Sequence, residues 1–402
     1  MTSRVNVPLS HLRGVVILIV VAFHSALPYL ASQPPEPYPF DTAPFHWVAF
    51  PIIDHERWFG LDLFCAWQDV SLMSLMFFLA GLLTPASLAR KGSLHYLADR
   101  WWRIGLPFLF AVAILSPLAY FASYRSTAVD PSFTAFWQHW LALPMWPAGP
   151  AWFLWQLFLL GTVAVALHAL APQWLEALGR LAGRLDERPP AFFVALTALS
   201  MLAYVPLAIK FSPWSWASFG PFAFELSRPL HYLVYFLAGV AVGRRGLNRG
   251  ILGSDGPLAR HWLAFLAIAV ASFAVWGGLT SLTMPDWDAS PFRDQLAAAL
   301  AFPPACASGG LFLLAISLRW LRAESRVLGS LSANAYHIYL VHYVFVVWLQ
   351  YALLSVSLPA IGKVIIVFAG ALTASWFAGA GLNALLPHFG VPGRGAIADQ
   401  PR

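Results

Sequence analysis

The chain has 402 residues, of which 59% are hydrophobic and only 10% are charged. Soluble domains average roughly 25% charged residues, so this composition excludes a water-soluble protein and predicts one that lies in a lipid bilayer. The two cysteines, Cys65 and Cys306, form neither a disulfide framework nor a metal-ligand spacing. The net charge of +6 does not indicate nucleic-acid binding, because the basic residues gather in short loops beside apolar segments.

Ten apolar segments follow one another along the chain, each with about the 20 residues that a membrane-crossing helix needs. They lie at 12–31, 62–86, 104–124, 151–171, 190–210, 227–243, 261–280, 296–318, 331–355 and 362–386. Ten crossings put both termini on one side. The loops on that side hold all of the 24 Lys and Arg residues except Arg57, Arg125, Lys210, Arg228, Arg293 and Lys363. We therefore predict an all-α polytopic membrane protein with about ten transmembrane helices and both termini in the cytoplasm.

The chain shows no linker, no heptad run and no internal repeat, so we expect one membrane-embedded domain over 8–387 and a short cytoplasmic tail over 388–402. Its beginning is similar to a signal peptide, but nine further spans need no secretion signal, and we expect it to be retained. The segments predicted outside, 32–60, 125–150 and 281–295, are rich in Trp, Asp, His and Pro. This composition suits contact with a polyhydroxyl surface, although a belt of interfacial aromatics explains any single Trp as well.

The first apolar segment, LRGVVILIVVAFHSALPYL (12–30), contains two ionisable residues. Arg13 and His24 are eleven residues apart, which is three helical turns plus about 20°, so both side chains share one face. The rise between them is about 16 Å, roughly half of a ~30 Å hydrocarbon core. An ionisable group near the middle of a membrane is costly and usually functional. We therefore interpret His24 as a site residue, and Arg13 as a residue that either binds substrate or anchors the helix at the interface.

A second cationic group stands in LARKGSLHYLADRWWRIGLPFLF, between the second and third segments. Arg100 and Arg103 are three residues apart and would project from neighbouring points of one helix face. Guanidinium groups bind phosphate through paired hydrogen bonds and keep their charge. Together with Arg90 and Lys91, these arginines indicate either a phosphate site or a positive-inside anchor.

Two further polar residues are predicted at the depth of His24. Asp69 lies about eight residues into the second segment from its outer end, and His342 lies eleven residues into the ninth from the cytoplasm. An Asp beside a His would orient the imidazole and stabilise its charged form. We expect Asp69 and His342 to join His24 in a catalytic group. His337, His168 and His231 are interpreted as core or interfacial histidines.

Five motifs together resemble acyltransferase family 3, the bacterial inner-membrane acyltransferases that modify cell-envelope glycans. They are LRG (12–14) with the following His24, MFFLAGLLTP (76–85), RWWRIGLPFLF (100–110), PAWFLWQLFLL (150–160) and NAYHIYLVHYVFV (334–346). The last motif is also similar to the glucan succinyltransferase branch. The chain departs from the family at His11, where an acidic residue is frequent, and at Ala80, where the family usually has Ser before Gly81.

The resemblance implies a multi-pass protein of the inner membrane that moves an acetyl or succinyl group from cytoplasmic acyl-CoA to a hydroxyl of an envelope glycan or related acceptor at the periplasmic face. It implies that His24 is the catalytic histidine, that Arg13 belongs to its motif, and that Arg100 and Arg103 bind the donor. The expected partners are acyl-CoA, membrane lipids and the acceptor, with no metal and no nucleic acid. His24 would deprotonate the acceptor or carry the acyl group itself.

Two other function classes remain open at this stage. A proton-coupled transporter would relay protons through His24, Asp69 and His342, but such folds usually contain inverted repeats, and the sequence shows none. A scaffolding or binding protein would leave Arg100 and Arg103 dispensable. The acyl group, the acceptor, the oligomeric state, and the choice between direct transfer and an acyl-histidine intermediate are likewise open.

Overall fold

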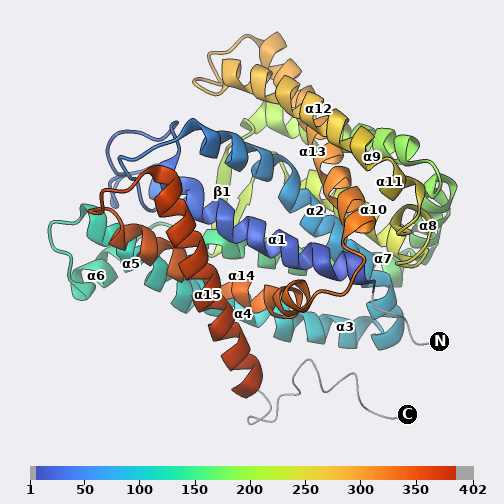
Figure 1. Cartoon of the computed structure of the whole chain (residues 1–402), viewed down its shortest axis with the longest axis horizontal. Helices are drawn as coiled ribbons and strands as arrows, with labels where there is room; N and C mark the ends of the chain where they lie inside the picture. The colour runs from blue at the N-terminus through green and yellow to red at the C-terminus, as the bar shows by residue number, and fades with distance from the viewer. Residues whose placement is uncertain (1–5, 386–402) are drawn as a thin grey trace. The chain divides into compact units, whose positions relative to one another are not determined.

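The computed structural model describes residues 6–385, and it is almost entirely helical (Figure 1). Clustering of backbone contacts divides the chain into two compact units, each assembled from three stretches of sequence. The first unit contains the described chain up to Leu12, Ala66–Leu109 and Ala151–Glu324. The second contains Arg13–Cys65, Phe110–Pro150 and the chain from Ser325 onward. The predicted single domain over 8–387 stays a prediction, and the predicted tail over 388–402 lies outside the described residues.

The first unit is a helical assembly with one small hairpin. Its helices are most of α2 (Phe59–Lys91), α3 (Ser93–Arg100), the π-helical turn η3 (Trp101–Gly105), α4 (Leu106–Phe110), α7 (Trp152–Leu170), α8 (Pro172–Leu185), α9 (Pro189–Phe211), α10 (Pro229–Gly243), the 3₁₀ turn η6 (Gly250–Leu252), α11 (Pro257–Arg260), α12 (Trp262–Thr283) and α13 (Phe292–Trp320). Strands β1 (Trp216–Phe219) and β2 (Phe222–Glu225) pair antiparallel. Helix α13 packs against α12 and α9, and α10 packs against α8 and α9.

Helices α2 and α10 approach each other closely because glycines line the contact. A Cβ atom added at Gly81 would lie 2.1 Å from the carbonyl oxygen of Phe236, and one at Gly239 would lie 2.1 Å from that of Phe78. One turn further, a Cβ at Gly243 would meet a backbone oxygen of α2 at 2.2 Å. Small residues spaced by four are the usual means of bringing two helix backbones together in a membrane. The crossing holds α2 and the beginning of α10, which both contribute to a polar cluster, in a fixed relation.

The second unit contains the later part of α1 (Val7–Ala26). Its other elements are η1 (Leu27–Tyr29), η2 (His46–Val48), the π-helical turn η4 (Ala111–Leu115), α5 (Ser116–Thr127), α6 (Phe133–Ala142), η5 (Gly149–Ala151), α14 (Arg326–Ala352) and α15 (Ala360–Leu385). Helix α14 lies beside α15 and α5 (Figure 1). The irregular segment after η1 is attached by a fully buried ion pair, in which Lys363 Nζ lies 2.7 and 3.0 Å from the two carboxylate oxygens of Asp54.

Eight helices in the described part of the chain are long and apolar enough to cross a membrane. All ten predicted segments coincide with helices, and the all-α polytopic fold is confirmed. Two of the ten differ from a simple span. Helix α10 has 15 residues, or about 22 Å, which is shorter than a ~30 Å hydrocarbon core. Helix α14 has 27 residues but buries the polar side chains of His337, His342 and Gln350. The cytoplasmic placement of the termini stays a prediction.

Candidate active site

His24 of α1 meets His342 of α14 inside the second unit. The Nδ1 atom of His24 lies 2.8 Å from the carbonyl oxygen of Val20, one turn earlier in the helix, and 3.3 Å from Nε2 of His342. The Nδ1 atom of His342 lies 2.7 Å from the carbonyl oxygen of Tyr339. A carbonyl oxygen only accepts hydrogen bonds, so these partners assign the proton of both neutral rings to Nδ1. The lone pair of His24 is therefore on Nε2, which has no hydrogen-bond partner among the described groups of the chain.

Neighbouring side chains hold the His24 backbone and ring. Gln350 of α14 donates a hydrogen bond of 2.7 Å from Nε2 to the carbonyl oxygen of His24. The rings of Phe23 and Tyr343 stand edge-on to the imidazole, with centroids at 5.1 and 5.4 Å. His342 is fully buried, whereas His24 is half-buried. The sequence predicted that His24 and His342 share a depth, and the structure brings them into contact.

Arg13 lies on the same helix as His24, and its side chain is exposed. The helix is regular α-helix from Val7 to Ala26, so the spacing of eleven residues corresponds to about 16 Å along the axis and to one shared face, as predicted. Arg13 and His24 thus mark two levels of one helix face.

The cationic group at the end of α2 and in α3 is internally paired. The carboxylate of Asp99 lies 2.8 Å from Lys91 Nζ and 2.8 Å from Arg103 Nε. The guanidinium of Arg100 lies over the ring of Tyr96, 5.0 Å from its centroid, and no described carboxylate pairs with it. Arg100 is therefore the more available of the two predicted donor-binding arginines, because Arg103 must leave or share Asp99 to bind another anion.

The helix geometry between the two arginines differs from the regular α-helix that the prediction assumed. The backbone N–H of Leu106 bonds to the carbonyl oxygen of Trp101, five residues earlier, which defines a π-helical turn. The ring of Trp101 lies against Gly105, where an added Cβ would be 2.5 Å from it. Arg103 lies inside this wide turn. The three-residue spacing from Arg100 therefore does not place the two side chains at the neighbouring points of one face that a regular α-helix would give. Turns of this kind are frequent at functional sites.

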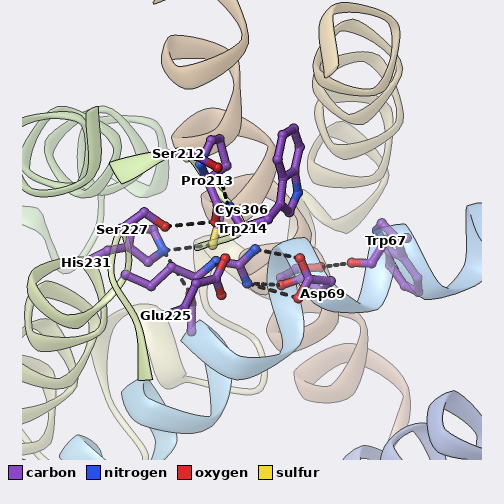
Figure 2. Close-up of polar contacts among 12 residues, drawn as sticks. Trp67, Asp69, Ser212, Pro213, Trp214, Glu225, Ser227, His231 and Cys306 are labelled. Atoms are coloured by element: carbon purple, nitrogen blue, oxygen red, sulfur yellow. Dashed lines mark hydrogen bonds and ion pairs between the residues drawn. The ribbon is translucent and has the colours of Figure 1, made fainter. Parts of the chain in front are cut away.

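Asp69 belongs to a buried charged cluster in the first unit (Figure 2). Arg228 donates from Nη1 and Nη2 to the two carboxylate oxygens of Asp69, at 3.0 and 2.6 Å, and its Nε lies 2.9 Å from Oε2 of Glu225. The guanidinium also lies over the ring of Phe302, 5.1 Å from its centroid. The side chains of Arg228 and Glu225 are 3% and 7% exposed, whereas that of Asp69 is 44% exposed. The predicted pairing of Asp69 with His24 stays a prediction, and the partner found for Asp69 is Arg228.

Burial raises the pKa of Glu225 to about 8; the positive charge of Arg228 opposes this rise, and the negative charge of Asp69 adds to it. Two carboxylates and one guanidinium would leave one uncompensated negative charge in a buried cluster. A proton on Glu225 removes that charge. The cluster is therefore coupled to pH through Glu225.

We expect this coupling to appear as a pH-dependent stability. Glu225 loses its proton near the ordinary pKa of 4.5 in the unfolded chain and near 8 in the folded chain. Between these two values the folded chain therefore holds more protons, and the contribution of Glu225 to the free energy of unfolding falls as the pH rises. Above pH 8 this contribution no longer changes. Each unit of pKa difference corresponds to about 1.4 kcal/mol. Unfolding in detergent at pH 5 and pH 8.5 should show a smaller loss for Glu225→Gln than for the wild type. The exposed Glu176→Gln is the control, and equal losses in all three proteins would contradict the prediction.

His231 of α10 is the centre of a second buried polar group in the same unit (Figure 2). Its Nδ1 lies 2.6 Å from Ser200 Oγ, and its Nε2 lies 2.9 Å from Ser74 Oγ and 3.4 Å from Cys306 Sγ. These partners come from α9, α2 and α13. His231 is fully buried, so its hydrogen bonds join four helices. This agrees with its interpretation as a core histidine.

Sequence reasoning did not single out several residues of these sites. Arg228 was counted only as an outer basic residue, Glu225 was not considered, and Tyr343 and Gln350 were treated as part of an apolar span. The available signal was Arg228 at the border of a predicted span, where a buried arginine needs an acidic partner. Gln350 inside an apolar helix is a comparable signal.

No group of three or more His, Cys, Asp or Glu side chains in the described residues is arranged to hold a metal ion. Cys65 and Cys306 are both buried, and the described residues contain no disulfide between them. The polar groups described above are a histidine pair, an arginine–carboxylate cluster, the group around His231 and a basic group around Asp99.

Comparison with known proteins identifies a family. The family model described as an acyltransferase domain, that of acyltransferase family 3, matches residues 7–380. The matched range begins with α1, ends within α15 and includes both compact units. No curated protein and no solved structure matches the chain.

Proposed function

The chain belongs to acyltransferase family 3 and is a membrane acyltransferase. From that premise we propose that it moves an acetyl or succinyl group from cytoplasmic acyl-CoA to a hydroxyl of an envelope glycan or related acceptor. The bacterial inner membrane and the periplasmic face are parts of the same proposal. A closer relation to the glucan succinyltransferase branch is also part of this proposal. The observation that carries the proposal is the His24–His342 pair, because it supplies a base with a defined lone pair.

The proposed chemistry begins at Nε2 of His24. This atom accepts the proton of the acceptor hydroxyl while the hydroxyl oxygen attacks the thioester carbonyl carbon. The C–S bond then breaks, and the CoA sulfur leaves with the proton returned by His24. During the step the Nδ1–H of His24 stays hydrogen-bonded to Val20 and His342, which orients the imidazolium and spreads its charge. The same lone pair would act as the nucleophile in an acyl-histidine route.

The arginines are proposed to bind the phosphates of the donor. Arg100 has no described carboxylate partner, and Arg13 is exposed on the face of α1 that carries His24. A guanidinium matches phosphate in geometry and charge. Arg103 would contribute when a phosphate replaces or joins Asp99.

The experiment that tests the function follows CoA release by purified protein in nanodiscs, with acetyl-CoA and succinyl-CoA offered separately. The proposal expects release from one of the two donors at a rate above that of empty nanodiscs, and faster release when the acceptor is supplied. Binding of CoA is measured on the same samples. Absence of both binding and release, together with substrate movement into sealed vesicles, would instead support the proton-coupled transporter.

We expect Arg100→Ala to raise the KM for acyl-CoA by about tenfold or more while kcat changes little. Hydrogen bonds to charged groups contribute roughly 1.5–3 kcal/mol, and an interaction made equally in the ground and transition states affects KM alone. The exposed Arg249→Ala, a basic residue of another loop, is the matched control. An unchanged KM in the Arg100 variant would remove Arg100 from the donor site.

A further inference from the structure

The ring of Tyr343 limits where the His24 imidazole can lie. Tyr343 follows His342 directly on α14, so one helix places two consecutive side chains beside His24. The Tyr343 and His24 rings stand at 79° with centroids 5.4 Å apart, and Tyr343 also contacts the His342 ring edge-on at 6.3 Å. Tyr343 is buried. Its ring therefore occupies the space into which His24 would otherwise turn.

The ring of Tyr343 is itself held by Tyr120 of α5. The two rings meet edge-on at 70°, with centroids 5.8 Å apart. Tyr120 is fixed in turn, because its hydroxyl donates to the carbonyl oxygen of Val48 at 2.7 Å. Gly149, with φ of +49°, makes room for the pair: a Cβ there would lie 3.2 Å from Tyr343 Cε1 and 3.3 Å from the Tyr120 hydroxyl.

The carbonyl group that accepts from Tyr120 lies in a fixed part of the segment between η1 and α2. Val48 ends η2, and Trp47 beside it is almost fully buried. The indole N–H of Trp47 donates to the carbonyl oxygen of Phe40 at 2.9 Å, its ring stacks on Phe40 at 4.2 Å, and it contacts Tyr120 at 5.1 Å. A change at Val48 is thus transmitted to Tyr343 through one hydroxyl.

We propose that Tyr343, held by Tyr120 and through it by the backbone at Val48, is a positioning residue for His24. The inference rests on the proposed function, because it assigns the tyrosine pair to the same histidine. A general base works only within about 2.6–3.2 Å of the atom whose proton it takes, and a misplacement of 1 Å can cost about 10²-fold in rate. The bond to Val20 fixes one edge of the imidazole, and the Tyr343 ring fixes its face.

The test measures kcat and KM for CoA release from the preferred acyl-CoA. Tyr343→Leu removes the ring and should lower kcat about 10- to 100-fold with an unchanged KM. Tyr343→Phe restores the ring and should recover most of that loss. Tyr120→Phe releases Tyr120 from Val48 and should lower kcat a few-fold. Adding Tyr343→Phe to it should lower kcat no further, because both residues act on His24 through the same Tyr343 ring.

Tyr351→Phe is the matched control, since this tyrosine lies on the same helix and packs in the same aromatic cluster but touches neither histidine. It should keep wild-type kcat. Wild-type kcat in Tyr343→Leu, a change confined to KM, or additive losses in the double variant would each overturn the inference. If His24→Ala is also fully active, the proposed function fails as well; if His24→Ala is inactive and Tyr343→Leu is normal, only the positioning role fails.

Discussion

Replacing His24 with alanine should lower the rate of CoA release by about 10²–10⁴-fold, the usual contribution of a positioned general base. The reason is that Nε2 is the one imidazole nitrogen of His24 left free by the bonds to Val20 and His342. The KM for acyl-CoA should change little, because the proposed phosphate contacts belong to other residues. The measurement is steady-state CoA release, with binding of CoA to both proteins determined alongside.

Three further variants make this result specific. His342→Gln retains an acceptor for the His24 Nδ1 proton, and we expect a smaller loss of about tenfold. His168→Ala removes an exposed histidine of α7 and should leave the rate unchanged. Thermal unfolding of each protein shows whether a loss of rate reflects a loss of structure. A folded His24→Ala protein with the wild-type rate would refute the catalytic role of His24.

Arg228→Met should be the most destabilising single change in the charged cluster, with a loss of about 3 kcal/mol in the free energy of unfolding. Removing one partner of a buried ion pair typically costs 3–5 kcal/mol, and the lower end applies because Asp69 is 44% exposed. The variant deprives Asp69 of its hydrogen-bond donor and both Asp69 and Glu225 of their shared positive charge. Denaturant or thermal unfolding in detergent provides the measurement.

The control for this change is Arg293→Met, which breaks an ion pair on the surface. Arg293 Nε lies 3.3 Å from Asp294 Oδ1, and the arginine side chain is 86% exposed. Exposed pairs contribute between 0 and about 1 kcal/mol. Adding Asp69→Asn and Glu225→Gln to Arg228→Met should restore part of the lost stability, because no unpaired carboxyl group then remains. A normal unfolding transition for Arg228→Met, or no recovery in the triple variant, would argue against an energetically important cluster.

The sequence was sufficient to predict the helical membrane fold. It also led to the hypothesis that His342 joins His24; the two rings lie in contact, and their catalytic role stays a prediction. Both predictions depend on regular helices: α1 keeps the 3.6-residue period from Val7 to Ala26, and polar residues are costly enough at mid-membrane depth to gather there. The charged cluster could not be predicted in the same way. Its members come from α2, β2 and the start of α10, and no local sequence pattern indicates that these elements meet.

The geometry of the group around Arg100 and Arg103 could not be predicted for a different reason. Hydropathy over 104–124 is high whether the helix is regular or contains π-helical turns, so the pattern carries no sign of η3 or η4. The fit of Trp101 against Gly105, which accompanies the wide turn, is a contact between a ring and a backbone. A spacing of three residues was therefore interpreted with the wrong period, and the partner of Arg103 was missed.

The wide turn at Trp101–Gly105 also makes this helix unusually tolerant of a change in length. A π-helical turn closes its hydrogen bond over five residues instead of four, so deletion of one residue there would leave an unbroken α-helix. The hydrogen bond from Leu106 to Trp101 would then close over four residues, as in a regular α-helix, and the helix on either side of it would keep its orientation. Phe108 would still stack on Phe222, with the ring centroids 5.6 Å apart, while Arg100 and Asp99 kept their places. A single-codon deletion inside the turn is thus a change in length that this helix could absorb without altering the faces it presents.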